Sequence, residues 1–80
     1  MKNSASIKTF GIHLRRLREF RNLSQQELAD LTDMAKTSIQ RFENAKMSAT
    51  IDSLISIAKA LDIPMKELMD FPFPKERAKK

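Results

Sequence analysis

Two short helical patterns, over residues 24–32 and 35–43, follow one another in the sequence with only a brief turn between them. A turn of about three residues makes two helices cross at a steep angle instead of running antiparallel. Such a crossing needs a small side chain where the backbones approach, and Ala29 supplies one. The turn also needs a residue that accepts a positive φ, and Asp33 is of a type that does. The sequence therefore predicts a tight pair of crossed helices near its centre.

Capping and apolar residues mark the limits of this pair. Ser24 is a good N-cap, and Glu27 stands where it completes a capping box with Ser24. Ile39 and Phe42 are the anchors that hold the second helix on the first. The buried side of the first helix is predicted to consist of Leu28, Ala29 and Leu31.

Three further helices complete an all-α chain, because no stretch alternates apolar and polar residues as a strand does. One is predicted from about residue 7 to residue 21, and Asn22 can close it in the left-handed conformation. Another follows the N-cap Thr50 and, being the most apolar, should form the floor of the core. The last begins around Pro64 and ends before Phe71, because the residue ahead of a proline is pushed out of helical geometry. Its inward side chains are expected to be Met65, Leu68 and Met69.

A chain of 80 residues with 41% hydrophobic residues can build one core. We expect a flexible segment over residues 1–6, one domain over residues 7–70, and an extended basic tail over residues 71–80. No run approaches the ~20 apolar residues of a membrane span, and the first residues lack the apolar stretch of a signal peptide. The chain has no cysteine, so no disulfide framework favours an extracellular protein. A cytoplasmic protein without membrane association is expected.

The net charge of +5 is concentrated at the two ends of the chain. Residues 1–21 hold six Lys or Arg against one Glu, and residues 75–80 hold four against one. The stretch between them is mildly acidic. Cationic helical ends favour a polyanion as partner, although ordinary solubility charge would give the same totals.

The residues that enzymes need are missing from the sequence. His13 is the only histidine and lies on the flank of the first helix's apolar stripe, where a half-buried packing role is expected. One histidine and no cysteine exclude the common zinc sites. No glycine-rich phosphate loop is present either. We expect no catalysis, no metal and no cofactor.

Several blocks of the chain resemble the lambda-repressor-like, or Cro-type, helix-turn-helix regulators. The matching stretches are LSQQELA at 23–29, SIQRFEN at 38–44, LISIAKAL at 54–61, and upstream Phe10-Gly11 with LRRLR at 14–18. Together they cover about residues 7–70 at the mutual spacing of that family. The resemblance implies a compact five-helix lambda-repressor-like DNA-binding domain.

The chain departs from this family at two positions where the family usually has glycine. Asp33 stands at the first, and its tolerance of the left-handed region makes the departure mild. Ala45 stands at the second. Either Asn44 takes the positive φ in its place, or the loop over residues 44–49 follows a different path.

A helical wheel at about 100° per residue separates two sides of the helix over residues 35–43. The buried side is predicted to hold Ala35, Ser38, Ile39 and Phe42. The outward side holds Lys36, Thr37, Gln40 and Arg41. In this fold the second helix of the pair lies in the major groove of DNA. The outward residues are therefore predicted to read bases, and a merely solvated helix face is the alternative.

Each outward residue suits a particular contact. Arg41 can bind guanine with two hydrogen bonds, and Gln40 can read adenine through its amide. Lys36 can bind guanine or a phosphate, and Thr37 a thymine methyl group or a phosphate.

Other residues are expected to bind the DNA backbone. The resemblance implies that Gln25 binds a phosphate through its amide and the free N–H groups of its helix, where the dipole also favours an anion. Ser24 is a second candidate there, although a capping role fits it better. Lys46 and Ser48, in the following loop, are expected to make backbone contacts. Long-range attraction, or simple solvation, is expected for Arg15, Arg16 and Arg21.

Arg18 and Glu43 match a pair that is salt-bridged in several members of the family. The pair would tie the first helix to the end of the reading helix. Removing one partner of a buried pair costs ~3–5 kcal/mol, whereas a surface pair is worth under ~1 kcal/mol.

The expected function is a sequence-specific DNA-binding transcriptional regulator, a repressor, that binds a palindromic site on double-stranded DNA as a homodimer. A prophage-type repressor, a controller of a restriction-modification operon and a DNA-binding antitoxin all fit this size. The alternative is an antitoxin or other protein-interaction module that keeps the fold. The dimer candidates are Ile63, Met65, Met69, Phe71 and Phe73, with Ile12 and Phe20. Alternatively, the Phe-Pro tail folds back over its own chain.

Overall fold

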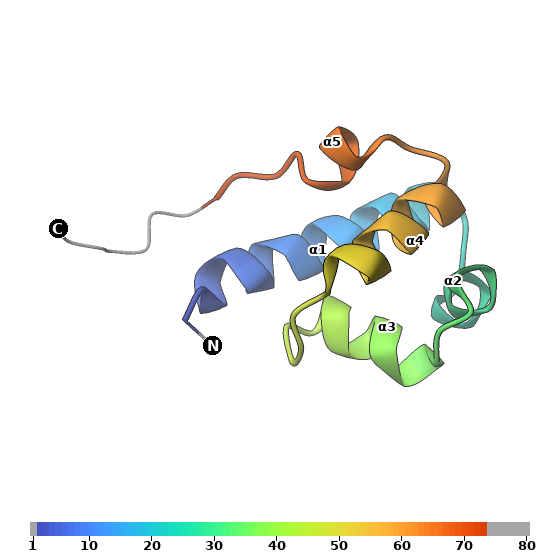
Figure 1. Cartoon of the computed structure of the whole chain (residues 1–80), viewed down its shortest axis with the longest axis horizontal. Helices are drawn as coiled ribbons and strands as arrows, with labels where there is room; N and C mark the ends of the chain where they lie inside the picture. Colours follow the sequence, from blue (N-terminus) through green and yellow to red (C-terminus); the bar gives the residue numbers. More distant parts are fainter. Residues whose placement is uncertain (1, 74–80) are drawn as a thin grey trace, which may run out of the picture.

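The five predicted helices are present in the structure, a computed structural model that describes residues 2–73 (Figure 1). They are α1 (Ser4–Phe20), α2 (Gln25–Thr32), α3 (Lys36–Glu43), α4 (Ile51–Leu61) and α5 (Met65–Leu68). No strand occurs in this part of the chain, so the all-α prediction is confirmed. The helix α2 packs on α3 and α4, while α1 packs on α3 and α5. Figure 1 shows α3 along one side of the molecule and α5 on the opposite side.

Each of the five helices contributes at least one completely buried side chain to a single core. These side chains are Leu14, Leu28, Ile39, Ile57, Leu61 and Leu68. Removing a leucine or isoleucine side chain from water contributes about 1.5–3 kcal/mol. The core therefore holds the short helices α2, α3 and α5, which are too short to be stable alone.

The helix α1 begins earlier than the sequence analysis predicted. It starts at Ser4, so the last three residues of the segment expected over residues 1–6 belong to the helix. The N–H of Ile7 donates to the carbonyl of Asn3 at 2.9 Å, and the hydroxyl of Thr9 donates to that of Ala5 at 3.0 Å. These bonds complete a helical turn ahead of the apolar stripe.

The prediction that Leu31 is buried is wrong, since its side chain is 60% exposed. Leu28 and Ala29 are both fully buried and set the inward direction of α2. Leu31 lies about 110° around the helix from the midpoint between these two residues, at 100° per residue. That angle turns it out of the core.

The segment after α5 folds back onto α1. Phe71 is buried, and its ring centre lies 5.8 Å from that of Phe10 and 5.6 Å from that of His13. The half-buried His13 also donates from Nε2 to the carbonyl of Glu67 at 3.0 Å, which is the packing role predicted for it. Phe71 is therefore a core residue, which agrees with the alternative in which the Phe-Pro segment folds back over its own chain. The predicted basic part of the tail, residues 74–80, lies outside the described residues.

The turns between the helices use left-handed residues. Asn22 and Asp33 have φ of 58° and 57°, as predicted. Ala45 itself has φ of 58°, while Asn44 has φ of −95°, so Asn44 does not take the positive φ in its place. The reason is a Schellman closure of α3, in which Lys46 N–H donates to Arg41 O at 2.8 Å and Ala45 N–H to Phe42 O at 3.3 Å.

Candidate nucleic-acid interface

The start of α2 is fixed by the predicted capping box. Ser24 Oγ accepts from the N–H of Glu27 at 3.0 Å, and Glu27 Oε1 accepts from the N–H of Ser24 at 2.7 Å. The hydroxyl oxygen of Ser24 is therefore engaged within the protein. The capping role fits this residue better than a phosphate contact does.

One side of α3 packs against the core, and the other side is exposed. Ile39 is fully buried and Phe42 almost so. Lys36, Thr37 and Arg41 are exposed. Gln40 differs from these three, because it is half-buried. Three of the four residues predicted to read bases are thus exposed, and the described part of the chain covers only part of Gln40.

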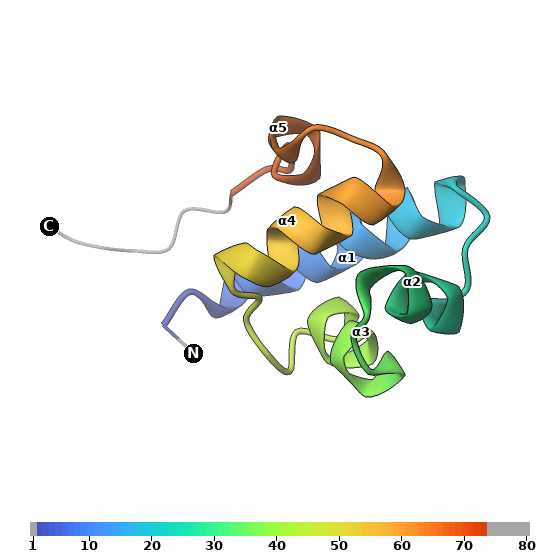
Figure 2. The same cartoon turned by 45° about the vertical axis from the view of Figure 1, so that its right-hand side comes forward.

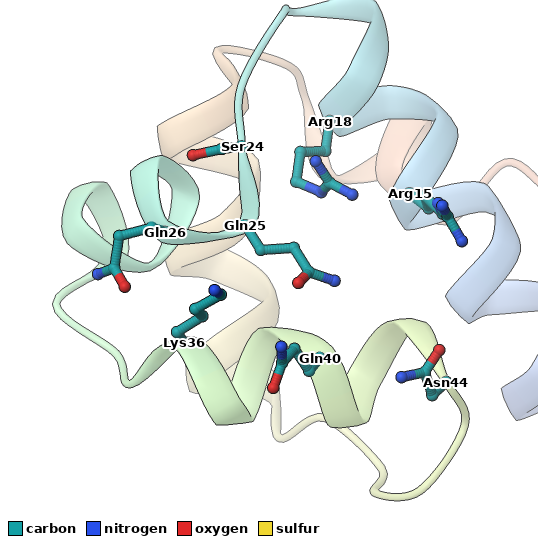
Figure 3. Close-up of a pocket in the computed structure, with 8 residues that line it drawn as sticks. All are labelled: Arg15, Arg18, Ser24, Gln25, Gln26, Lys36, Gln40 and Asn44. Atoms are coloured by element: carbon teal, nitrogen blue, oxygen red, sulfur yellow. The ribbon is translucent and has the colours of Figure 1, made fainter.

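A groove of about 530 Å³ runs between α1, the start of α2 and α3 (Figure 3). Its lining residues are Arg15, Arg18, Ser24, Gln25, Gln26, Lys36, Gln40 and Asn44. Its charged lining residues are Arg15, Arg18 and Lys36, and the other five are polar and uncharged. Arg15 and Arg18 are ion-paired with Glu19 and Glu43, which offsets part of this positive charge.

The predicted base-reading residues divide between the groove and its rim. Lys36 and Gln40 line the groove, whereas Thr37 and Arg41 are exposed outside its lining. Lys36, Gln40 and Asn44 follow one another at four-residue steps and so share one face of the helix. That spacing was the available signal for Asn44, which the sequence analysis missed as a groove residue.

The groove also receives side chains from α1 and α2. Arg15 lines it and donates to Glu19 at 3.2 Å, an exposed pair that leaves the guanidinium with free donors. Gln26 was not singled out from the sequence, and its amide donates to Asp30 in its own helix at 2.9 Å. The structure thus brings α1 into a surface that the sequence analysis assigned to α2, α3 and a loop.

Arg18 and Glu43 form a buried ion pair with two parallel hydrogen bonds. Arg18 Nε donates to Glu43 Oε2 at 2.6 Å, and Arg18 Nη2 donates to Glu43 Oε1 at 3.0 Å. The two side chains are 8% and 2% exposed, so the buried alternative holds. The hydrogen bond with Glu43 raises the pKa of Arg18 further above its usual value, and burial opposes it less strongly. The pair joins α1 to the last turn of α3.

Gln25 lies beside this pair. Its Nε2 donates to Glu43 Oε1 at 3.0 Å, and its side chain is half-buried. Figure 3 shows it reaching from the start of α2 into the groove. Gln25 was predicted from the sequence to bind a phosphate, whereas its contact with Glu43 was not predicted.

The remaining predicted backbone contacts lie apart from the groove lining. Lys46 and Ser48 are exposed in the loop between α3 and α4. Arg21 donates to the carbonyl of Asp62 at 3.4 Å. Arg16 lines a different hollow, together with Asp70. Of the three arginines expected to attract DNA at long range, only Arg15 lines the groove, and Arg16 and Arg21 do not.

The described residues 2–73 contain neither a candidate metal cluster nor a membrane-spanning helix. No group of three or more His, Cys, Asp or Glu side chains in this region is arranged to hold a metal ion. No helix in it is long and apolar enough to cross a membrane.

The chain matches a family model and several characterised proteins. The helix-turn-helix family model HTH_3 matches residues 14–68. Control protein C.BamHI of Bacillus amyloliquefaciens is 35% identical over 63 residues, 78% of each chain. The HTH-type transcriptional repressor RghR of Bacillus subtilis is 38% identical over 64 residues, 79% of this chain and 47% of that one. The crystal structure of the restriction-modification controller protein C.AhdI from Aeromonas hydrophila superposes with a TM-score of 0.78 at 33% identity, over 80% of this chain and 97% of that one.

Proposed function

The chain belongs to the helix-turn-helix family of DNA-binding transcriptional regulators, and from this premise we propose that it is a repressor that reads a palindromic operator through α3. The observation that carries the proposal is the open polar face of α3, with Lys36, Thr37 and Arg41 exposed, beside a groove lined by polar and basic side chains. A helix of this kind enters the major groove with its first residues on base edges.

The two sides of the α3 face read DNA differently. Arg41 and Thr37, which are exposed, contact bases directly, and Arg41 prefers guanine. Gln40 and Lys36 stand where the groove meets α3. Gln40 reads adenine through its amide, and Lys36 binds guanine or an adjacent phosphate.

Phosphates bind along the groove and the following loop. Gln25 and the free N–H groups at the start of α2 hold one phosphate, where the helix dipole favours negative charge. Arg15 joins this set because it lines the same groove. Ser24 serves mainly as the helix cap, and Lys46 and Ser48 contact the backbone from the loop.

A palindromic operator calls for a homodimer, with half-sites ~34–36 Å apart. The structure changes the set of side chains available for the interface. Phe71 is buried, and Ile63, Met65 and Met69 pack against the core. The predicted candidates Ile12, Phe20 and Phe73 are exposed. Large apolar side chains are also exposed on α4, at Ile51 and Ile55, and at Leu31 of α2, which shares a hollow with α4. Figure 2 shows α4 and α2 on one side of the molecule, with α3 next to them. We place the second copy there.

Control of a restriction-modification system is the task that the relatives favour. The sequence alignment with control protein C.BamHI extends over 78% of this chain, and the structural superposition with C.AhdI extends over 80% of it. Such a regulator acts by binding DNA in the cytoplasm and not by catalysis. The antitoxin alternative has no comparable support.

Selection from random duplexes, with the binding stoichiometry, tests the DNA-binding proposal. We expect one palindrome, bound by two chains, with a preference of at least ~10³ over random DNA. Equal affinity for all duplexes, or no affinity, would contradict it.

Charge substitutions test the dimer face. Ile51→Glu and Ile55→Glu should shift the protein toward monomer in sedimentation experiments, since they place carboxylates in an apolar contact. Ile12→Glu, on α1, is the matched control and should leave the dimer intact. A dimer that survives both α4 substitutions but not the control would place the interface on α1.

A further inference from the structure

One carboxylate on α3 receives hydrogen bonds from two other helices. Glu43 Oε2 accepts from Arg18 Nε at 2.6 Å, and Glu43 Oε1 accepts from Arg18 Nη2 and from Gln25 Nε2, each at 3.0 Å. Only 2% of the Glu43 side chain is exposed. The carboxylate therefore lies beneath the groove, and it is the point where α1, α2 and α3 meet.

This carboxylate determines which end of the Gln25 amide faces inward. An ionised carboxylate can only accept hydrogen bonds, so the nitrogen of Gln25 must point toward Glu43. An amide nitrogen carries two N–H groups, and the second is left for another acceptor. Without Glu43 the amide is free to turn by 180° and present its oxygen, which repels a phosphate.

We infer that Glu43 is a positioning residue that holds the Gln25 amide as a phosphate donor. The ion pair with Arg18 thereby couples the phosphate contact of α2 to the base-reading helix α3. The inference rests on the proposed function, in which Gln25 binds a phosphate of the operator.

The backbone at the start of α2 is held by the same pair. Arg18 Nη1 donates to the carbonyl of Leu23 at 2.7 Å, two residues before Gln25. Both the chain leading into α2 and its first side chain are therefore fixed relative to Arg18 and Glu43. Since Glu43 belongs to the last turn of α3, a phosphate on Gln25 has a defined distance to the bases under α3.

The test must remove the carboxylate without leaving a buried charge. Glu43→Gln alone strands Arg18 and endangers the fold. The double variant Arg18→Met/Glu43→Leu fills the same space with apolar groups, and such replacements commonly preserve folding. Gln25→Met then removes the amide while keeping a side chain of similar length. Gln26→Met is the matched control, because Gln26 lines the same groove but bonds to Asp30 in its own helix.

Dissociation constants for the selected palindrome are measured for each variant by fluorescence anisotropy, with circular dichroism to verify folding. In the natural protein Gln25→Met should weaken binding about tenfold, as expected for a hydrogen bond to a charged group. In the double variant Gln25→Met should cost nothing further, whereas Gln26→Met should have the same effect in both backgrounds. The same tenfold loss from Gln25→Met in both backgrounds would overturn the inference and leave the proposed function intact.

Two other outcomes separate the inference from its premise. A Gln25→Met variant with undiminished affinity in the natural protein would refute the phosphate role of Gln25 and the inference with it. Failure of the natural protein to bind any duplex would refute the proposed function itself. If the double variant does not fold, nuclear magnetic resonance of the natural protein can test whether Glu43 holds the Gln25 amide. The side-chain amide protons of Gln25 should exchange with water more slowly than those of the exposed Gln26, and equal rates would overturn the inference.

Discussion

A Cβ atom placed on Gly11 would lie 2.6 Å from the carbonyl oxygen of Glu43. The carbonyl oxygen of Phe42 would be equally close. Real Cβ atoms do not approach backbone oxygens to this distance, so only glycine allows α1 to meet the end of α3 here. The contact fixes the last turn of the proposed reading helix against α1, next to the Arg18–Glu43 pair.

Replacing Gly11 by alanine should therefore destabilise the protein, although alanine favours helices by about 1 kcal/mol over glycine. Overpacking against two rigid carbonyls costs about 1–3 kcal/mol or more, so the net loss should be visible in urea unfolding. Lys8→Ala, on the exposed surface of the same helix, is the control and should change stability by less than ~0.5 kcal/mol. An equally stable Gly11→Ala protein would show that α1 and α3 can separate freely.

Replacing Ala45 by glycine should have the opposite effect. Ala45 has φ of 58°, a region in which a Cβ atom costs roughly 1–2 kcal/mol, and glycine removes that cost. We expect a gain of about 1 kcal/mol in the free energy of unfolding, after the greater entropy of glycine in the unfolded chain is counted. Ala60→Gly, within α4, should lose about 1 kcal/mol. A loss at both positions would mean that the turn does not strain Ala45.

The buried ion pair should tolerate joint replacement better than single replacement. Arg18→Met or Glu43→Leu alone leaves an unpaired buried charge and should cost ~3–5 kcal/mol. The two together should cost much less than the sum, and a double-mutant cycle in urea measures the difference. Additive losses would indicate that the two charges do not interact in the folded protein.

The two phenylalanines after α5 should differ in their effect on stability. Phe71 is 8% exposed and contacts Phe10, so Phe71→Ala should cost about 3–5 kcal/mol. Phe73 stacks on Phe71 with ring centres 4.4 Å apart, but it is 60% exposed, and Phe73→Ala should cost under ~1 kcal/mol. Thermal unfolding followed by circular dichroism distinguishes the two. Similar melting temperatures would argue against the docking of this segment on α1.

Substitution of two basic residues, Arg41 and Lys46, should affect DNA binding in different ways. Arg41→Ala should cost ~1–3 kcal/mol on the selected palindrome and relax the preference at one base pair. Lys46→Ala should weaken binding to all duplexes alike and lower the slope of log K against log salt by ~1. Competition assays over a range of salt concentrations separate these patterns. A uniform loss from Arg41→Ala would instead make Arg41 a phosphate contact.

The features that the sequence predicted well are those determined by near neighbours. The capping box of Ser24 and Glu27 and the N-cap Thr50 involve partners three residues away, so the residue types alone specify them. The turn at Asp33 is local in the same sense. Local patterns of this kind also predicted the positions of α2 and α3 in the sequence, and therefore which side of α3 faces outward.

The features that were missed depend on contacts between distant segments. Gln25 and Glu43 are 18 residues apart, and the residues next to each in the sequence do not predict their hydrogen bond. Leu31 was misplaced because an apolar side chain at helical spacing was taken to face the core, whereas the inward direction of α2 depends on its packing against both α3 and α4. Phe71 became a core residue only because α1 presents Phe10 and His13 to it.

The only glycine of the chain lies within a helix, while every left-handed residue among residues 2–73 carries a side chain. A saturation mutagenesis survey should therefore find glycine required within a helix and optional in the turns. Glycine should be acceptable at Asn22, Asp33, Ala45 and Asp62, where φ is positive, and position 11 should reject every other amino acid. Tolerance at these positions is then set by the room left for a Cβ atom between two helices and not by the usual place of glycine in turns.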